Sequence, residues 1–375
     1  MSAHANPNII TDGLVYMYDT GSGKSFKGEP TTNLNTFTLS DSGTDGSGQS
    51  SVGTRTVITD NHVRIVDTAS NTRQTHVITG LTASTTYTIS ISYKKLVGTP
   101  TFRFQIQDYS GSSYLRTIKF TNTSEIGIED KEGWQLASWT FTLGSDANAV
   151  RIWYQDGADY TTYTHSFELQ NPQLEAKSHA TPYVDGTRSA TQGLLDLTRN
   201  STIDLSNVTF DSNSQMSFDG SDDIINTGLF SGRNPSTDPF TVEAMVKSDV
   251  TSGSRIWIDA TTNGSSQRFY SALIDSTSHA IGIQGSAWSD PTPGDTVWHH
   301  QVIVMDGNTA KAYNNGELAS SKSYTSYTLA GGLNVGGRSG YRWVGQIPLF
   351  KIYDRALTQN EVSLNYNAIK SRFGL

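Results

Sequence analysis

Apolar and polar residues alternate along most of this chain, which is the pattern of a β-strand with one buried face. Residues 87–93, YTISISY, place Tyr and Ile on one side and Thr and Ser on the other. Clusters of Gly, Asn, Asp and Ser separate such runs, as in turns between short strands. Further strand-like runs occupy residues 102–107, 139–143, 150–154, 215–218, 240–246, 254–259, 279–283, 299–305, 310–313, 332–335 and 347–353.

Turn and helix signals complete this pattern. Asp-Gly at 306–307 and Asn-Gly at 315–316 favour tight hairpins, because these residues tolerate positive φ. One helix is predicted, over residues 358–368, with Thr358 as N-cap and Glu361 completing a capping box. Many short strands without helical crossovers predict an all-β protein: two antiparallel β-sandwiches (jelly rolls) with one short C-terminal helix.

The composition narrows the classes of function. A net charge of −8 and the lack of a Lys/Arg run argue against nucleic-acid binding, and no window of about 20 apolar residues predicts a membrane span. The chain has no cysteine, so it needs no oxidising compartment and no thiolate chemistry is expected. Its first residues lack a basic stretch followed by an apolar one, so no secretory signal is expected. These features suit a protein made in a cytoplasm that later works outside a cell.

The second half of the chain carries six ordered motifs that resemble those of the laminin-G-like, concanavalin-A-like jelly roll. The resemblance implies that fold for this part of the chain. The motifs are MSFDGSDDII at 216–225, FTVEAMVK at 240–247, WHHQV at 298–302, YNNGEL at 313–318, LNVGG at 333–337 and IYDRALT at 352–358.

The two ends of the chain carry a narrower resemblance. The segment ITDGLVYMYD at 10–19 looks like the opening of the same jelly roll in virion proteins of tailed phages, and NYNAIKSRFGL at 365–375 looks like their ending. If both ends belong to one sandwich, the middle of the chain is an insertion, which a surface loop accommodates at small entropic cost. We therefore expect residues 1–30 and 187–375 to form the laminin-G-like jelly roll and residues 31–186 to form an inserted domain.

The expected insertion resembles carbohydrate-binding β-sandwich modules. This resemblance implies a second antiparallel sandwich with a surface that contacts sugars. It is carried by TNL at 32–34, GLTASTTYT at 80–88, GW at 133–134 with WTFT at 139–142, and FELQNPQLE at 167–175.

The signals for catalysis are weak. The acidic run at 125–132 faintly resembles the strand that carries catalytic carboxylates in jelly-roll glucanases, but Gly127 stands where the central Asp would be. His299 and His300 are neighbours on a predicted strand, so they face opposite sides and cannot chelate one ion together. No phosphate-binding loop or Ser-His-Asp order stands out in the sequence. We predict that the protein is not an enzyme and has no catalytic residues.

Calcium is the one cofactor that the sequence suggests. Asp219, Asp222 and Asp223 form an oxygen-rich turn, and the resemblance adds that laminin-G-like domains sometimes hold Ca²⁺ on their rim. Calcium takes roughly six to eight oxygen ligands, which carboxylates and loop carbonyls supply. The alternative interpretation is a turn that only caps a strand.

Aromatic side chains are the stronger candidates for a carbohydrate-binding surface, because sugars stack their apolar C–H faces on Trp and Tyr rings. The alternation at 150–154 places Arg151 and Trp153 on the face opposite the core residues. The following loop adds Tyr160 and Tyr163. Packing against the other domain or a neighbouring subunit is the alternative explanation for this patch.

Two aromatic residues of the expected jelly roll are further candidates for carbohydrate binding. Trp288, Tyr341 and Trp343 lie in or beside predicted loops, and the first two are the candidates. Trp134 and Trp298, by contrast, are assigned to the cores of their domains.

The leading hypothesis is a phage virion structural protein, made in the host cytoplasm and located in the virion as a capsid-decoration, tail or fibre component. Its expected partners are other virion proteins, further copies of itself in a homo-oligomer, and host-surface glycans, which would give it an adhesive role. The first alternative is a free carbohydrate-binding protein or adhesin. The second is a glycoside hydrolase or lyase, which needs two convergent carboxylates in a cleft.

Overall fold

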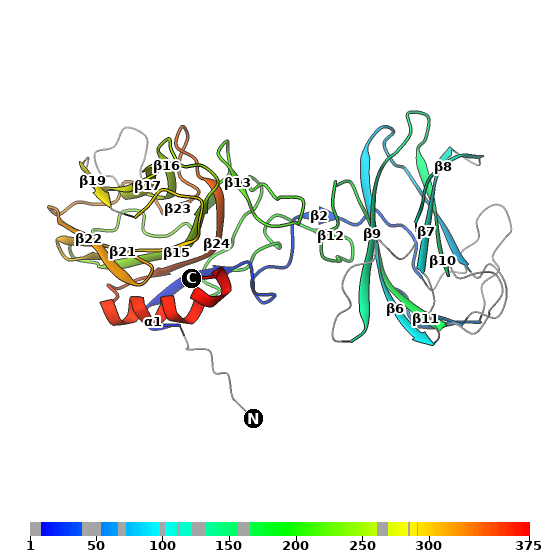
Figure 1. Cartoon of the computed structure of the whole chain (residues 1–375), viewed down its shortest axis with the longest axis horizontal. Helices are drawn as coiled ribbons and strands as arrows, with labels where there is room; N and C mark the ends of the chain where they lie inside the picture. Colours follow the sequence, from blue (N-terminus) through cyan, green and yellow to red (C-terminus); the bar gives the residue numbers. More distant parts are fainter. Residues whose placement is uncertain are drawn as a thin grey trace, which may run out of the picture. The chain divides into compact units, whose positions relative to one another are not determined.

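The computed structural model describes residues 9–39, 54–66, 73–97, 102–110, 113–121, 132–156, 166–260, 269–283, 286–290 and 292–375. These parts are mostly antiparallel β-sheet with one short C-terminal helix, which confirms the predicted fold class (Figure 1). The chain forms two compact units. Unit 1 comprises Met1–Pro30 and Arg188–Leu375, and unit 2 comprises Thr31–Thr187.

The first sheet of unit 1 joins segments from both ends of the chain. Strand β1 (Leu14–Asp19) pairs antiparallel with β24 (Val344–Tyr353). The strand order is β1-β24-β15-β20-β21-β22, with β13 also beside β24. The other strands of this sheet are β13 (Phe218–Asp219), β15 (Phe240–Ser248), β20 (His299–Asp306), β21 (Thr309–Asn314) and β22 (Glu317–Ser323).

The second sheet of unit 1 has the order β14-β23-β16-β17-β18-β19. Its strands are β14 (Ile225–Asn226), β16 (Arg255–Asp259), β17 (Phe269–Asp275), β18 (Ser278–Ile283), β19 (Ser286–Asp290) and β23 (Asn334–Val335). Alternate residues of both sheets point inward and form one core, in which Trp257 lies edge-on to Phe350. Tyr18 of β1 stacks on Phe350 as well, with ring centroids 5.9 Å apart, so β1 is part of this core.

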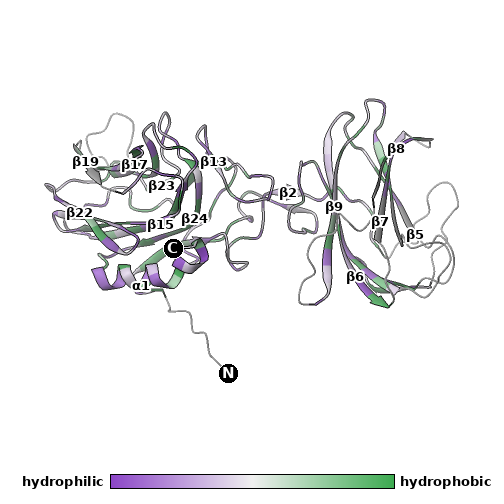
Figure 2. Ribbon diagram, in the orientation of Figure 1, coloured by the Kyte–Doolittle hydropathy of each residue, from purple (hydrophilic) through white to green (hydrophobic). Residues whose placement is uncertain are grey.

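The outer face of the first sheet is covered by helix α1 (Gln359–Ile369), which continues into the short 3₁₀ helix η2 (Lys370–Phe373) (Figure 1). Thr358 is the N-cap and forms the predicted capping box with Glu361. Hydrophilic and hydrophobic residues alternate along α1 (Figure 2), as expected for a helix that packs with one face only. Val362, Asn365 and Ile369 form its buried side.

A carboxylate lies fully buried between α1 and the first sheet. Glu243 on β15 is opposite Lys351 on β24, and Lys351 Nζ donates to Glu243 Oε1 at 2.7 Å. His300 Nε2 lies 3.0 Å from the same oxygen, and Asn365 Nδ2 of α1 donates to Oε2 at 2.7 Å. Each carboxylate oxygen therefore has at least one partner, as a buried charge requires.

The same network reaches the N-terminal segment. The backbone N–H of Ile10 donates to Asn365 Oδ1 at 2.8 Å, and the hydroxyl of Tyr353 donates to the carbonyl of Ile10 at 3.1 Å. Burial by itself would raise the pKa of Glu243. The charge of Lys351 and the hydrogen bond with His300 outweigh that effect and lower the pKa from 4.5 to about 2.

Unit 2 is a second sandwich of two antiparallel sheets. One has the order β5-β10-β7-β8 and the other β3-β4-β11-β6-β9, and their inner faces form a separate core. Strand β2 (Thr31–Thr32) pairs with β12 (Thr187–Arg188). The sheets comprise β3 (Thr54–Thr59), β4 (His62–Val66), β5 (Arg73–Thr79), β6 (Thr86–Val97), β7 (Phe102–Ser110), β8 (Ser113–Thr121), β9 (Trp134–Thr142), β10 (Ala149–Asp156) and β11 (Ser166–Glu175).

A buried carboxylate also organises the segments where the chain enters and leaves unit 2. Glu175, at the end of β11, is fully buried and accepts hydrogen bonds from the hydroxyls of Thr31 and Thr181, both at 2.8 Å. Asn33 bonds through its side chain to the backbone N–H of Leu174 and to the carbonyl of Val184. The polar residues of the entry and closing motifs therefore hold these segments together.

We expect the Glu243 network to make unit 1 sensitive to acid. A carboxylate whose pKa is 4.5 when unfolded and about 2 when folded gives stability that is complete above pH 4.5 and is lost as the pH falls toward 2. Replacing Glu243 by Gln should lower the free energy of unfolding at pH 7 by about 3–5 kcal/mol, because Lys351 stays buried without its counter-ion. Hydrogen exchange of the β15 and β24 amides measures this for unit 1 alone.

The control for this experiment is Glu317→Gln, which removes an exposed carboxylate from β22. Its exchange rates should match those of the wild type at each pH. Equal behaviour of the two variants between pH 7 and pH 3 would contradict the structural role given to Glu243.

Candidate functional site

Tyr341, one of the predicted carbohydrate-binding residues, is part of a small aromatic and cationic surface on unit 1. The guanidinium carbon of Arg338 lies 4.9 Å from the ring centre of Tyr341 and 5.3 Å from that of Tyr270 on β17. Arg338 Nη1 donates to Oδ1 of the fully buried Asp259 at 2.8 Å. We call these four residues the Tyr341 platform.

Two glycines explain why this loop lies against the sheet. Gly336 and Gly337, from the LNVGG motif, both have positive φ, at 92° and 84°. A Cβ on Gly337 would lie 2.6 Å from the carbonyl oxygen of Ile256, so only glycine allows this close approach to β16. The backbone N–H of Ile256 then donates to the carbonyl of Tyr341 at 2.9 Å, which fixes the position of the aromatic residue.

The chemistry of the Tyr341 platform suits a polar ring-shaped ligand. Tyr341 is 43 % exposed, so its ring is accessible from solvent. Arg338 is held in place by its ion pair with Asp259 and by its two aromatic neighbours, so little side-chain entropy is lost when it donates a hydrogen bond. An exposed ring beside an oriented donor is the combination by which proteins bind sugars.

Trp288 has a different environment from Tyr341. It lies on β19, the edge strand three places from β16 in the second sheet, and its half-buried ring packs on the core of unit 1. Its Nε1 donates to the hydroxyl of Ser320 on β22 at 3.2 Å, and Lys322 Nζ lies 5.7 Å from the ring centre. Trp288 therefore links the edges of the two sheets, and the structure does not bring it together with Tyr341.

The predicted patch of unit 2 is described only in part. Val150 and Ile152 point into the core of unit 2, as the alternation predicts. Arg151 lies on the other face, where its Nε donates to Gln107 Oε1 at 2.8 Å. Trp153 follows on β10, opposite Thr75 and Gln105. The other two residues of the patch, Tyr160 and Tyr163, lie outside the described residues.

The three aspartates of the proposed calcium turn do come together. One carboxylate oxygen from each of Asp219, Asp222 and Asp223 lies within 4.8 Å of the others. Both oxygens of Asp223 already accept hydrogen bonds, one from the N–H and hydroxyl of Thr209 and the other from the N–H of Asp219. Ser221 N–H donates to Asp219 Oδ1 at 2.7 Å.

This hydrogen bonding bears on whether calcium fits. Burial raises the pKa of the Asp223 carboxyl, and the backbone donors around it act against that rise. An ion would have to share oxygens that are already used, and calcium needs roughly six to eight of them. The described geometry is that of a turn held by Asp223, and calcium binding remains a prediction.

The residues considered for catalysis have structural surroundings where they are described. His299 Nε2 lies 2.8 Å from Asp295 Oδ1, on the inner side of β20, whereas His300 faces Glu243 beneath α1. The two histidines therefore point to opposite faces, as the alternation predicts. Most of the acidic run at 125–132 lies outside the described residues.

One family model matches part of unit 1. Residues 218–363 match the laminin-G-type model described as the concanavalin A-like lectin/glucanases superfamily. This stretch contains the Tyr341 platform, so the platform lies within a lectin-like fold.

None of the curated proteins matches the chain. None of the described helices has the length and hydropathy of a membrane span.

Several solved structures are similar to part of the chain at low identity. The binding domain of Paraclostridial Mosquitocidal Protein 1 is 16 % identical with a TM-score of 0.38, and the match covers 47 % of this chain and 49 % of that chain. The binding domain of Botulinum Neurotoxin DC is 12 % identical with a TM-score of 0.36, covering 48 % and 50 %. A Trypanosoma rangeli sialidase is 13 % identical with a TM-score of 0.38, covering 47 % and 31 %. The chain thus spans half or less of each structure.

Sequence reasoning identified Tyr341 but missed its partners. Arg338 directly follows the two glycines of the LNVGG motif, and Asp259 ends a predicted strand. A charged residue at the end of a strand or beside a glycine pair was therefore a usable signal. Arg338 and Asp259 are 79 positions apart in the chain, and the pattern of a single sequence does not show which distant residues come into contact.

We expect Asp223 to stabilise its turn with or without calcium. Replacing Asp223 by Ala should lower the free energy of unfolding by about 1–3 kcal/mol, because the backbone N–H groups of Thr209 and Asp219 lose their buried acceptor. Thermal unfolding in EDTA and in millimolar CaCl₂ measures both effects. Asp222→Asn is the control, since Asp222 is exposed and its loss should matter only if an ion binds.

The measurements in EDTA and in CaCl₂ distinguish a calcium site from a turn held by hydrogen bonds alone. A wild-type melting temperature that rises with CaCl₂, and no longer rises in Asp222→Asn, would establish a calcium site. The same melting temperature for Asp223→Ala and the wild type in EDTA would contradict the hydrogen-bonding role of Asp223.

Proposed function

We propose that this protein is a non-catalytic, glycan-binding structural protein, and that unit 1 binds sugar through the Tyr341 platform. One observation carries the proposal: an exposed Tyr341 ring beside an Arg338 guanidinium that is anchored on a buried Asp259. The platform lies within the stretch that matches the concanavalin A-like lectin family. The ring provides a stacking surface and the guanidinium provides fixed donors for sugar hydroxyls.

The other predicted residues support this proposal less strongly. Trp288 is half-buried, and its indole N–H is already bonded to Ser320. Arg151 is bonded to Gln107, and its guanidinium carbon lies 5.9 Å from the ring centre of Tyr109. Both side chains are therefore already engaged in contacts within their own unit. Tyr341, by contrast, is 43 % exposed.

The proposal extends to a virion as the place where the protein works, as a capsid-decoration, tail or fibre component that assembles with other virion proteins and with copies of itself. Its support is the resemblance of residues 10–19 and 365–375 to the two ends of phage virion proteins. Both segments belong to unit 1, where β1 pairs with β24 and Ile10 bonds to Asn365. Glycans on a host surface are the proposed ligands.

Loss of the Tyr341 ring should weaken glycan binding. We expect Tyr341→Ala to reduce the affinity for a glycan selected on an array by about fivefold to tenfold, because the stacking surface is lost, and Tyr341→Phe to retain most of it. Calorimetric titration of the full chain measures both values. Leu318→Ala is the control, since Leu318 is another exposed apolar side chain of unit 1, at 51 %. Equal affinities for Tyr341→Ala and the wild type would contradict the platform as the binding site.

Virion incorporation has an independent test. Purified particles from the source should contain peptides of both units in stoichiometric amounts by mass spectrometry, because units 1 and 2 are parts of one chain. Particles without these peptides would contradict the virion assignment. In that case a measured affinity for glycans would favour the alternative, a free carbohydrate-binding protein or adhesin.

A further inference from the structure

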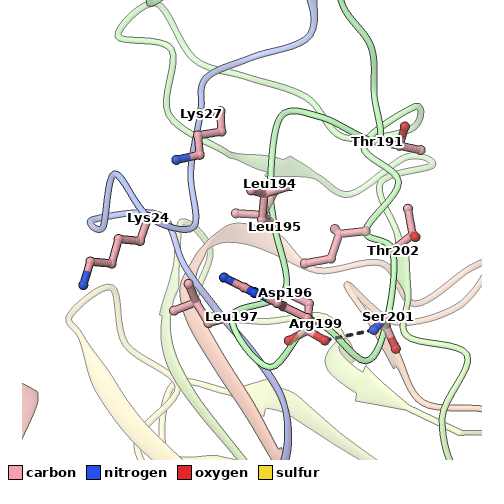
Figure 3. Close-up of a pocket in the computed structure, with 11 residues that line it drawn as sticks. Lys24, Lys27, Thr191, Leu194, Leu195, Asp196, Leu197, Arg199, Ser201 and Thr202 are labelled. Atoms are coloured by element: carbon pink, nitrogen blue, oxygen red, sulfur yellow. Dashed lines mark hydrogen bonds between the residues drawn. The ribbon is translucent and has the colours of Figure 1, made fainter.

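A hollow in unit 1, whose lining includes none of the residues of the Tyr341 platform, has a volume of about 650 Å³. It lies between the loop 191–203 and the turn that contains Lys24 and Lys27 (Figure 3). All of its lining residues belong to unit 1. We call it the Arg199 pocket, after the arginine that lines it.

The two segments that form the Arg199 pocket are joined by backbone hydrogen bonds. Lys27 N–H donates to the carbonyl of Gly193, and Leu195 N–H donates to the carbonyl of Ser25, each at 2.8 Å. The hydroxyl of Ser25 returns a bond to the carbonyl of Leu195 at 2.7 Å. The walls are therefore fixed relative to each other without a ligand, which lowers the entropic cost of binding.

Three cationic side chains line this pocket: Lys24, Lys27 and Arg199. Among the described residues, no acidic side chain forms an ion pair with any of them, and Lys27 Nζ donates only to the carbonyl of Gly23. Other arginines of unit 1, such as Arg338 and Arg372, are paired with aspartates. This hollow therefore gathers three cations that pair with no described carboxylate, in a chain whose net charge is −8.

The one acidic residue of the lining does not neutralise these cations by contact. Asp196 is 5 % exposed, and its carboxylate accepts hydrogen bonds from the backbone N–H groups of Met17, Thr198, Asn200 and Ser201. Figure 3 shows the bond to Ser201. Its oxygens are turned toward the loop that they hold together, so the pocket presents more positive than negative groups to a ligand.

Arg199 occupies a backbone conformation that normally favours glycine or asparagine. Its φ is +64°, in the left-handed region, which costs an arginine roughly 1–2 kcal/mol. Its backbone N–H donates to the carbonyl of Asp196 at 3.1 Å, so it closes the turn. This strained conformation makes the side chain of Arg199 a candidate for function.

We infer that the Arg199 pocket binds a saccharide that carries a carboxylate. Lys24, Lys27 and Arg199 would bind the carboxylate, while Leu195 and Leu197 offer apolar contact to the C–H face of the ring. Thr202 adds a hydroxyl for hydrogen bonds to the sugar. The inference rests on the proposed glycan-binding function for the sugar part of the ligand, and the charge of the pocket adds the acidic group.

The test compares matched sugars on the full chain. Ligand-observed saturation-transfer NMR on the full chain with Tyr341→Ala, which removes the ring of the other proposed site, should give binding for glucuronic acid and not for glucose. The affinity for the acid should fall as the salt concentration rises. Arg199→Gly should weaken glucuronic acid binding by about tenfold, because one charge-assisted contact is lost. The same substitution should not lower the melting temperature, since glycine accepts φ of +64°. Lys311→Gln removes a cation from β21, outside the pocket, and should leave binding unchanged.

Three outcomes would overturn the inference. Equal binding of glucose and glucuronic acid would show that the carboxylate is not recognised. An unchanged affinity for glucuronic acid in Arg199→Gly would show that the Arg199 pocket is not the binding site. Inorganic phosphate that competes as well as glucuronic acid would show a simple anion site without sugar recognition. Tyr341→Ala should leave glucuronic acid binding intact, so failure at the Tyr341 platform and failure at the Arg199 pocket are distinguishable.

Discussion

The buried charge of Glu243 is the constraint on which the architecture of unit 1 depends. An ionised carboxylate beneath a helix is tolerated only when its oxygens are paired, and here the partners come from β24, β20 and α1. The amide of Asn365 then connects the cluster to Ile10, so the N-terminal segment is tied to the same point. Once β1 is fixed beside β24, the chain can leave unit 1 after Pro30 and return at Arg188.

The same use of acidic residues recurs at the loops. Asp196 orders the loop of the Arg199 pocket, Asp223 orders the turn that resembles a calcium site, and Glu175 fastens the entry to unit 2. In each case a buried carboxylate accepts hydrogen bonds from nearby backbone N–H groups or hydroxyls, which is how a loop rich in polar groups avoids unsatisfied donors. Of these three carboxylates, only Asp223 belongs to a cluster that the sequence suggests as a metal site, and in the structure it accepts hydrogen bonds within its turn.

The parts of the fold that the sequence could predict are those with a local signal. Period-two alternation identified β15, β20 and β24, and the Thr358 capping box identified the start of α1, because these signals are local. Strand β22 was missed because its sequence, ELASSKS, is an exposed edge without apolar alternation. Only the two residues Phe218 and Asp219 form β13, so Phe218 alone of the strand expected at 215–218 lies in a strand, and Met216 makes an isolated bridge with Phe210. Local patterns determine the strands, whereas contacts between distant segments determine which loops are ordered.

The candidate sites also combine features that are visible in the local sequence with contacts between distant segments that are not. Tyr341 could be chosen from the sequence because it is an aromatic residue in or beside a predicted loop, but its ion-paired neighbour Arg338 could not be assigned without the contact to Asp259. Arg199 gave no signal, since nothing near it in sequence shows that Lys24 and Lys27 line the same pocket. What separates these two arginines is their counter-ion. Arg338 is neutralised by a buried aspartate and can serve as an oriented donor for a neutral sugar, whereas Arg199 lacks an acidic partner among the described residues and therefore favours a ligand that brings its own negative charge.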